Sequence, residues 1–235
     1  MFETRSFLPQ WIASLPIDWT RGCDTNSLER ARGAYDSPGR HYHTWRHVER
    51  CVELLGTFSC ENPRAVFLAL VFHDAIYVPG RQDNEAQSAA LARAELAISA
   101  SIPAPELDEI ARMILATSDH HAYASRTPDE ATMLDIDLSI LGASRDEYRD
   151  YARAIFDEYV PAVASEARFR IGRLEFLYKT AAMEHIFLTA HAQDRWDETA
   201  RANLAWEIHS LSEQQGLAER SISAIRNALS RDAER

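Results

Sequence analysis

Four of the nine histidines fall in a stretch of 35 residues that ends at Asp74. His43 and His47 are four residues apart, so on a helix they would share one face. His73 and Asp74 are adjacent and follow an apolar run, 65–72. Because burying two titratable side chains is costly unless something binds them, this doublet predicts a divalent metal ion. Imidazole and carboxylate suit Mn, Mg, Fe, Ni, Co and Zn to different degrees, so the metal is left open.

A histidine on one helix, a His-Asp doublet on a second and a late aspartate on a third together resemble the HD superfamily of metal-dependent phosphohydrolases. The doublet is His73-Asp74, and the spacing from Tyr42 to His47 is similar to the first motif of the cyclic nucleotide phosphodiesterases. The pattern also resembles a bacterial group described as predicted HD phosphohydrolases. It covers roughly residues 35–207. The resemblance implies an all-α helical bundle around a metal site.

The ligands that the resemblance implies are His47, His73, Asp74 and Asp137. Asp137 is chosen because it begins an Asp-Leu-Ser segment like the one that carries the last ligand in the phosphodiesterases. Asp135 lies two positions earlier, on a different face of the expected helix, so the two aspartates should not bind one ion. Asp135 is instead expected to orient a ligand histidine.

Other polar residues are candidates for roles beside the metal. The phosphodiesterase-like motif makes His43 a general acid for the leaving group, which suits a side chain that changes charge near neutral pH. Its alternatives are an additional ligand and a plain surface residue. Glu85, in a family-like Asn-Glu-x-x-Ser pattern, would position the attacking water or serve only as an acid at a helix start. His120 fits a Thr-x-x-His element that binds a second ion, with His121 or a plain surface pair as alternatives.

Three arginines are candidates for substrate binding, because a guanidinium can hold two phosphate oxygens with parallel hydrogen bonds. Arg40 lies beside the first motif, and Arg170 and Arg173 lie in a segment that is similar to a family element. Arg201 ranks below them, because an intrahelical salt bridge with Glu198 accounts for that pair.

The implied activity is hydrolysis of a small phosphoester, a nucleotide or a related phosphomonoester or diester, by metal-activated water. The chain lacks a phosphate-binding Gly-x-x-x-x-Gly-Lys loop, a Rossmann glycine pattern and a Gly-x-Ser-x-Gly elbow, so those enzyme classes lose support. The alternative is a non-catalytic, regulatory HD protein that binds a metal or a nucleotide. A two-iron oxygenase of the same superfamily is a minority option.

Apolar residues recur at helical spacing between Pro and Gly breaks, and no segment alternates like a strand, so the sequence predicts an all-α fold. A single domain is expected over 1–235, with its core motifs at about 35–142 and its C-terminal helices, 145–229, packed on that core. Ser144 should begin a helix, with Glu147 completing a capping box. The expected helices are 27–35, 43–58, 64–77, 84–99, 106–117, 130–141, 145–159, 166–188, 196–215 and 217–229.

Composition limits the partners and the compartment. A net charge of −11 argues against nucleic acid held by bulk charge, and a hydrophobic content of 46% suits a sizeable helical core. The three cysteines lack metal-finger spacing and suit a reducing cytosol. The longest apolar runs, of about eight residues, are far shorter than the ~20 that cross a bilayer. We expect a cytoplasmic protein with a small phosphorylated substrate and no membrane partner. The sequence does not decide the oligomeric state, and a homodimer is one option.

Overall fold

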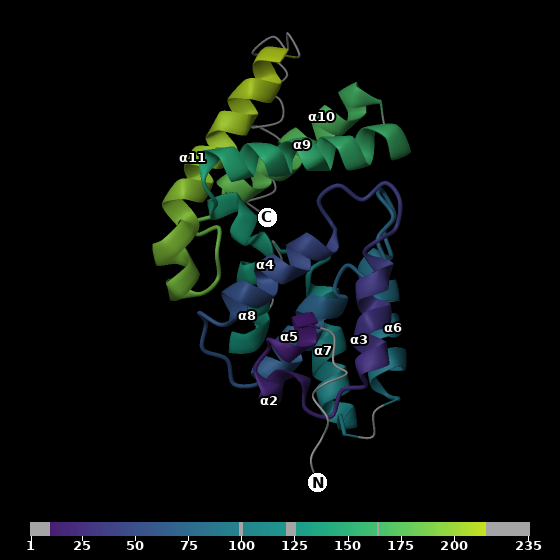
Figure 1. Ribbon diagram of the computed structural model, residues 1–235. Helices are drawn as coiled ribbons and strands as arrows, with labels where there is room; N and C mark the ends of the chain where they lie inside the picture. Colours follow the sequence, from purple (N-terminus) through teal and green to yellow (C-terminus); the bar gives the residue numbers. More distant parts are fainter. Residues whose placement is uncertain (1–9, 99–100, 121–125, 164, 215–235) are drawn as a thin grey trace. The chain divides into compact units, whose positions relative to one another are not determined.

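The computed structural model describes residues 10–98, 101–120, 126–163 and 165–214. Over these residues the protein consists of α-helices α1 to α11 and a 3-10 helix, without a strand (Figure 1). The all-α fold class predicted from the sequence is therefore confirmed. The chain divides into two compact units, an N-terminal unit (1–120 and 125–136) and a C-terminal unit (121–124 and 137–235). The expected single domain over 1–235 stays a prediction.

The N-terminal unit contains the helices that carry the His-Asp doublet and the first histidine motif. The helices of the N-terminal unit are α1 (Gln10–Ala13), α2 (Ile17–Thr20), α3 (Thr25–Ala34), α4 (Trp45–Leu55), α5 (Pro63–Phe72), α6 (Asn84–Leu96), α7 (Ala104–Ala116) and α8 (Pro128–Asp137). The last residue of α8, Asp137, is assigned to the C-terminal unit.

Among the described residues of both units, no helix is long and apolar enough to cross a membrane.

Helix α5 is the centre of the N-terminal unit. Every residue from Ala65 to Phe72 is buried, because the helix is apolar on all faces and packs against α2, α3, α4, α6 and α7. The helix start is fixed by Asn62, whose side chain accepts a hydrogen bond from the Ala65 amide at 3.2 Å. The carboxylate of Asp129 in turn accepts hydrogen bonds from the amides of Glu61 and Asn62. This central helix ends at the proposed metal ligands.

Truncation of the central helix should destabilise the protein strongly. Phe67 is fully buried, so Phe67→Ala should lower the free energy of unfolding by about 3–5 kcal/mol, through lost apolar burial and the cavity left behind. The control is Ile98→Ala, since Ile98 is 61% exposed and should change stability by less than about 0.5 kcal/mol. Urea unfolding followed by circular dichroism measures both. Equal effects for the two variants would contradict the central position of α5.

Several helix boundaries differ from the sequence prediction, and those of α4 and α5 lie beside the candidate site. Helix α4 begins at Trp45 rather than at residue 43, because Thr44 has an extended backbone and acts as the N-cap residue. Helix α5 ends at Phe72 rather than at residue 77. Helix α9 continues to Ala162 instead of ending before Pro161. A proline near a helix end removes only one intrahelical hydrogen bond, which the long helix tolerates there.

The C-terminal unit is built around α11. The amide of Asn203 on α11 donates to the carbonyls of Leu141 and Ala143 at 2.8 and 2.9 Å. A side chain at Gly142 would lie 2.4 Å from the Cβ of Trp196, so glycine is needed for this close packing. The capping box predicted for Ser144 and Glu147 is present. The elements are the 3-10 helix (Leu138–Gly142), α9 (Arg145–Ala162), α10 (Glu166–Ala181) and α11 (Ala190–Gln214), while the expected helix 217–229 lies outside the described residues.

Candidate metal centre

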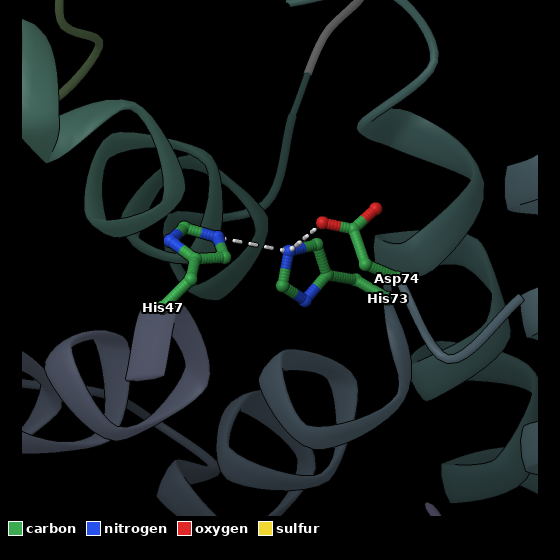
Figure 2. Close-up of side chains that lie close together, drawn as sticks. All are labelled: His47, His73 and Asp74. Carbon is green, nitrogen blue, oxygen red and sulfur yellow. Dashed lines mark hydrogen bonds and ion pairs between the residues drawn. The ribbon is translucent and has the colours of Figure 1, made fainter. Parts of the chain in front are cut away.

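His47, His73 and Asp74 lie together in the N-terminal unit, as the sequence predicted for three of the four ligands. Figure 2 shows the His73 ring between the other two side chains. His73 Nε2 lies 3.2 Å from His47 Nε2 and 3.0 Å from Asp74 Oδ2. One ligand atom from each residue fits within 4.8 Å of the others, so the group could hold a metal ion. Both histidines are buried, and Asp74 is partly buried.

Two helices bring these residues together. Helix α4 buries one face, on which Trp45, Val48 and Leu55 enter the core at helical spacing and carry His47 inward with them. Helix α5 ends inside the core, so its C-cap residue His73 and the following Asp74 stay close to that face. The packing of α4 on α5 therefore sets the separation between the two histidines.

The hydrogen-bond partner of His73 fixes which of its ring nitrogens carries a hydrogen. His73 Nδ1 lies 2.8 Å from the Leu70 carbonyl oxygen, which can only accept, so Nδ1 is the donor. In the neutral ring the lone pair is then on Nε2, and it faces a carboxylate oxygen and a second imidazole nitrogen. Acceptor atoms this close require a cation between them, either a proton on one of these atoms or a metal ion.

Cys51 is a neighbour of the site that the sequence treated only as a packing residue. It is fully buried one helical turn after His47, and its Sγ lies 3.8 Å from both ring nitrogens of that histidine. The signal in the sequence was the spacing of four residues on one helix.

The three cysteines of the described chain form no disulfide, and burial raises the pKa of the Cys23 and Cys60 thiols to about 11.

His43 lies close to His47, although the expected shared helix face is wrong. Residue 43 precedes the N-cap of α4 and is outside the helix, yet the centroids of the two rings are only 6.4 Å apart. The His43 ring stacks on Tyr77, with centroids 4.0 Å apart and planes 25° apart, and the Tyr42 ring meets its edge. His43 is half-buried, so it is held beside the metal-binding group while part of it faces solvent.

The remaining candidate ligands are on or next to other helices. Asp137 is the last residue of α8 and is half-buried, whereas Asp135 is almost fully buried in the same helix. His120 is half-buried and follows α7. His121 lies outside the described residues. Asp137 and His120 as ligands stay predictions.

The Asn-Glu-x-x-Ser pattern has a structural basis around Glu85. The side chain of Asn84 pairs with both backbone groups of Val78, and the hydroxyl of Ser88 bonds both backbone groups of Ile76. Asn84 and Ser88 thereby fix the segment that follows the His-Asp doublet. Glu85 is half-buried in the first turn of α6, and no described residue makes a hydrogen bond to its carboxylate. Its proposed role at the attacking water stays a prediction.

Arg40 is next to the metal-binding group, but its guanidinium donates to backbone carbonyls. Its Nη1 lies 2.9 Å from the His43 carbonyl oxygen and 2.7 Å from that of Asp74, and Nη2 lies 3.0 Å from that of Ala75. The predicted phosphate contact would have to compete with these hydrogen bonds.

Arg173 and Arg170 belong to α10 in the C-terminal unit. Arg173 is buried and forms a two-point ion pair with Glu207, at 2.8 and 3.0 Å, while its Nη1 donates to the hydroxyl of Tyr151. Burial alone would lower the pKa of Arg173, but Tyr151 and Glu207 outweigh it and raise this pKa well above the ordinary value. Arg170 pairs with Glu166 one turn earlier. Phosphate binding by either arginine stays a prediction.

The ion pair of Arg173 predicts a large loss of stability on truncation. Arg173→Ala would leave the buried Glu207 carboxylate without its counter-ion, so the free energy of unfolding should fall by about 3–5 kcal/mol. The control is Arg153→Ala, which removes a pair whose arginine side chain is 75% exposed and should cost less than about 1 kcal/mol. Thermal and urea unfolding measure both. If Arg173→Ala were as mild as the control, the pair would not hold α10 to α11.

Comparisons with known proteins add no relative. No family model matches the chain, and neither the curated proteins nor the solved structures contain a match.

Proposed function

We propose that the chain is a metal-dependent phosphohydrolase of the HD type that acts on a small phosphoester, a nucleotide or a related phosphomonoester or diester. A divalent ion is proposed to bind His47, His73 and Asp74, with Asp137 as the fourth ligand and His120 as a ligand of a second ion. The proposal includes a cytosolic location. Its support is the motif order in the sequence and the geometry of the three residues that the structure brings together.

One observation carries the proposal. His73 Nε2 lies 3.2 Å from His47 Nε2 and 3.0 Å from a carboxylate oxygen of Asp74, and one ligand atom from each of the three residues lies within 4.8 Å of the others. A proton on His73 Nε2 would be shared between two acceptors, and a proton on His47 Nε2 would leave the lone pair of His73 Nε2 facing the carboxylate, whereas a metal ion would bind all three lone pairs. The separations match those of ligand atoms that each lie about 2.1 Å from one ion. The fit of the donor set therefore favours a metal over a proton.

The protein's own residues have distinct proposed tasks. A divalent ion supplies a nucleophile from water near neutral pH and draws charge from the phosphoryl oxygens. His43, held against Tyr77 beside His47, would donate a proton to the leaving oxygen. Glu85 would orient the attacking water from α6. The side chains buried around His47 and His73 exclude bulk water from the ligands, which strengthens their attraction for a cation.

The test combines metal content with turnover. The full-length protein should be purified without added metal, then analysed for bound elements and titrated with Mn²⁺, Co²⁺, Ni²⁺, Fe²⁺, Mg²⁺ and Zn²⁺. A panel of phosphomonoesters, phosphodiesters and cyclic nucleotides then measures hydrolysis, with and without a chelator. Stoichiometric metal and chelator-sensitive hydrolysis are the expected results.

Other outcomes separate the alternatives. Stoichiometric metal without turnover on any phosphoester would replace the enzyme by a regulatory, metal-binding protein. Bound iron with oxygen uptake would indicate the oxygenase option. If the protein bound all six metals only weakly, with dissociation constants in the millimolar range or higher, the proposed function would be contradicted altogether.

A further inference from the structure

The end of α5 presents a structural problem that nearby side chains solve. The last four carbonyls of any α-helix lack an intrahelical partner, and at a surface they bond to water. Helix α5 ends in the core, where an unpaired carbonyl costs about 1–3 kcal/mol. The ring of His73 and the amide of Ala75 satisfy the carbonyls of Leu70 and Phe72. The turn that carries the proposed ligands therefore depends on specific partners.

Tyr35 supplies one of these partners from the end of α3. Its hydroxyl donates to the Val71 carbonyl oxygen at 3.0 Å and accepts from the Asp74 amide at 3.3 Å. Burial and the Asp74 charge raise the pKa of this hydroxyl well above its ordinary value, so the hydroxyl keeps the proton it donates. Tyr35 thereby joins the last turn of the helix to the ligand residue that follows it.

Arg40 bonds the carbonyls of the two residues after His73, and it also connects this turn to the first motif. Its Nη1 atom has two hydrogens, and both are used, one by the Asp74 carbonyl and one by the His43 carbonyl. Its Nη2 atom holds the Ala75 carbonyl. The guanidinium also lies over the rings of Tyr35 and Tyr77, at 5.1 and 5.6 Å from their centroids. One side chain thus links three backbone positions and two aromatic rings.

We propose that Arg40 is a positioning residue, which fixes the Asp74 turn against the segment that carries His43, and that it does not contact the phosphate of the substrate. The inference for the metal site rests on the proposed function, whereas the inference for the backbone does not. A planar guanidinium is required because a lysine ammonium cannot hold three carbonyls in one fork while it lies between two rings. Both Nη1 hydrogens and one Nη2 hydrogen are engaged, and the remaining Nε hydrogen is buried, so the guanidinium has no open two-point edge for a phosphate.

The first experiment measures metal binding alone. Arg40→Ala and Arg40→Lys are titrated with Co²⁺ and with Mn²⁺, in the full-length protein and without substrate. Loss of an outer partner of a metal site typically weakens affinity by roughly 10–100-fold, and we expect that range for Arg40→Ala. Guanidinium chloride at low millimolar concentration should restore part of the affinity in Arg40→Ala, because the free ion can occupy the vacated place between the rings.

The second experiment measures the backbone without metal. Amide hydrogen exchange in the apo protein should become faster in Arg40→Ala over residues 70–78 and 41–47, and Tyr35→Phe should reproduce the change over 70–78 only. The matched control is Arg201→Ala. Arg201 also holds three backbone carbonyls, those of Ala181, Met183 and Glu184, but it does so in the C-terminal unit. The Arg201→Ala variant should leave the metal affinity and the amide exchange rates of both segments unchanged.

The outcomes are distinguishable. If the wild-type protein binds no metal while exchange in Arg40→Ala accelerates as expected, the proposed function fails and the positioning role stands. If Arg40→Ala keeps wild-type metal affinity and exchange but loses affinity for inorganic phosphate, Arg40 is a phosphate contact and the inference is overturned. If Arg40→Ala does not fold, Arg40→Lys carries the same comparison, and unchanged exchange and metal affinity there would overturn the inference as well.

Discussion

Replacing Asp74 with alanine should abolish metal binding and activity while leaving the helical fold in place. The backbone of Asp74 makes the structural contacts, its amide to Tyr35 and its carbonyl to Arg40, and the substitution keeps both. The side chain instead faces His73 Nε2 at 3.0 Å, where it would give the ion its anionic ligand. Affinity should fall by more than the roughly 100-fold that outer partners cost. Elemental analysis, metal titration and turnover measure the effect, and circular dichroism checks the fold.

The matched control for this variant is Asp36→Ala. Asp36 is an exposed aspartate just after α3, and its loss should change neither metal content nor turnover. An Asp74→Ala protein that kept stoichiometric metal and wild-type turnover would remove Asp74 from the site. A variant that lost its helical spectrum would instead assign the carboxylate a structural role.

His47→Ala and His43→Ala should fail in different ways, although the two rings are neighbours. His47 is buried against His73, so its loss should lower metal occupancy and activity together. His43 is half-buried on Tyr77 and should act on the leaving group, so its loss should keep the metal and lower the rate by roughly 10²–10⁴, the usual effect of a positioned acid. Metal content and turnover, measured on the same preparations, separate the two roles.

The choice of substrate sharpens this comparison. A nitrophenolate leaving group needs little protonation, so His43→Ala should lose much less rate on nitrophenyl esters than on alkyl esters. His47→Ala should lose rate on both. The control is His209→Ala, since His209 is an exposed histidine in α11. If His43→Ala emptied the site of metal, His43 would be a ligand. If it lost no rate on either ester, Glu85 or water would have to supply the proton.

The parts of the fold that the sequence predicted well are those that depend on neighbours in the chain. Ser144 with Glu147 marks the start of α9, because these two capping partners are only three residues apart. The apolar run 65–72 lies within the helix expected at 64–77, and α5 forms there. The His-Asp doublet was likewise found from adjacent residues, together with a histidine on the buried face of α4.

The parts that it missed depend on partners far along the chain. Helix α5 ends five residues earlier than expected. Tyr35 bonds the Val71 carbonyl in its last turn, and Arg40 bonds the carbonyls of Asp74 and Ala75 just after it, which no local pattern reveals. The ion pair of Arg173 was also not foreseen, because its partner Glu207 is 34 residues away on another helix. The boundary at Thr44 escaped notice for a different reason. Its side chain makes no capping hydrogen bond, so only its extended backbone separates His43 from α4.

The interior end of α5 also has an electrostatic consequence. Aligned peptide dipoles give the C-terminal end of a helix the equivalent of about half a negative charge, and a buried end is poorly screened by water. That end and the Asp74 carboxylate together outweigh the single positive charge of Arg40 beside them, so the turn attracts a cation and repels an anionic phosphate. We therefore expect a phosphorylated ligand to bind only weakly before the metal, so that the metal binds first and the phosphate second.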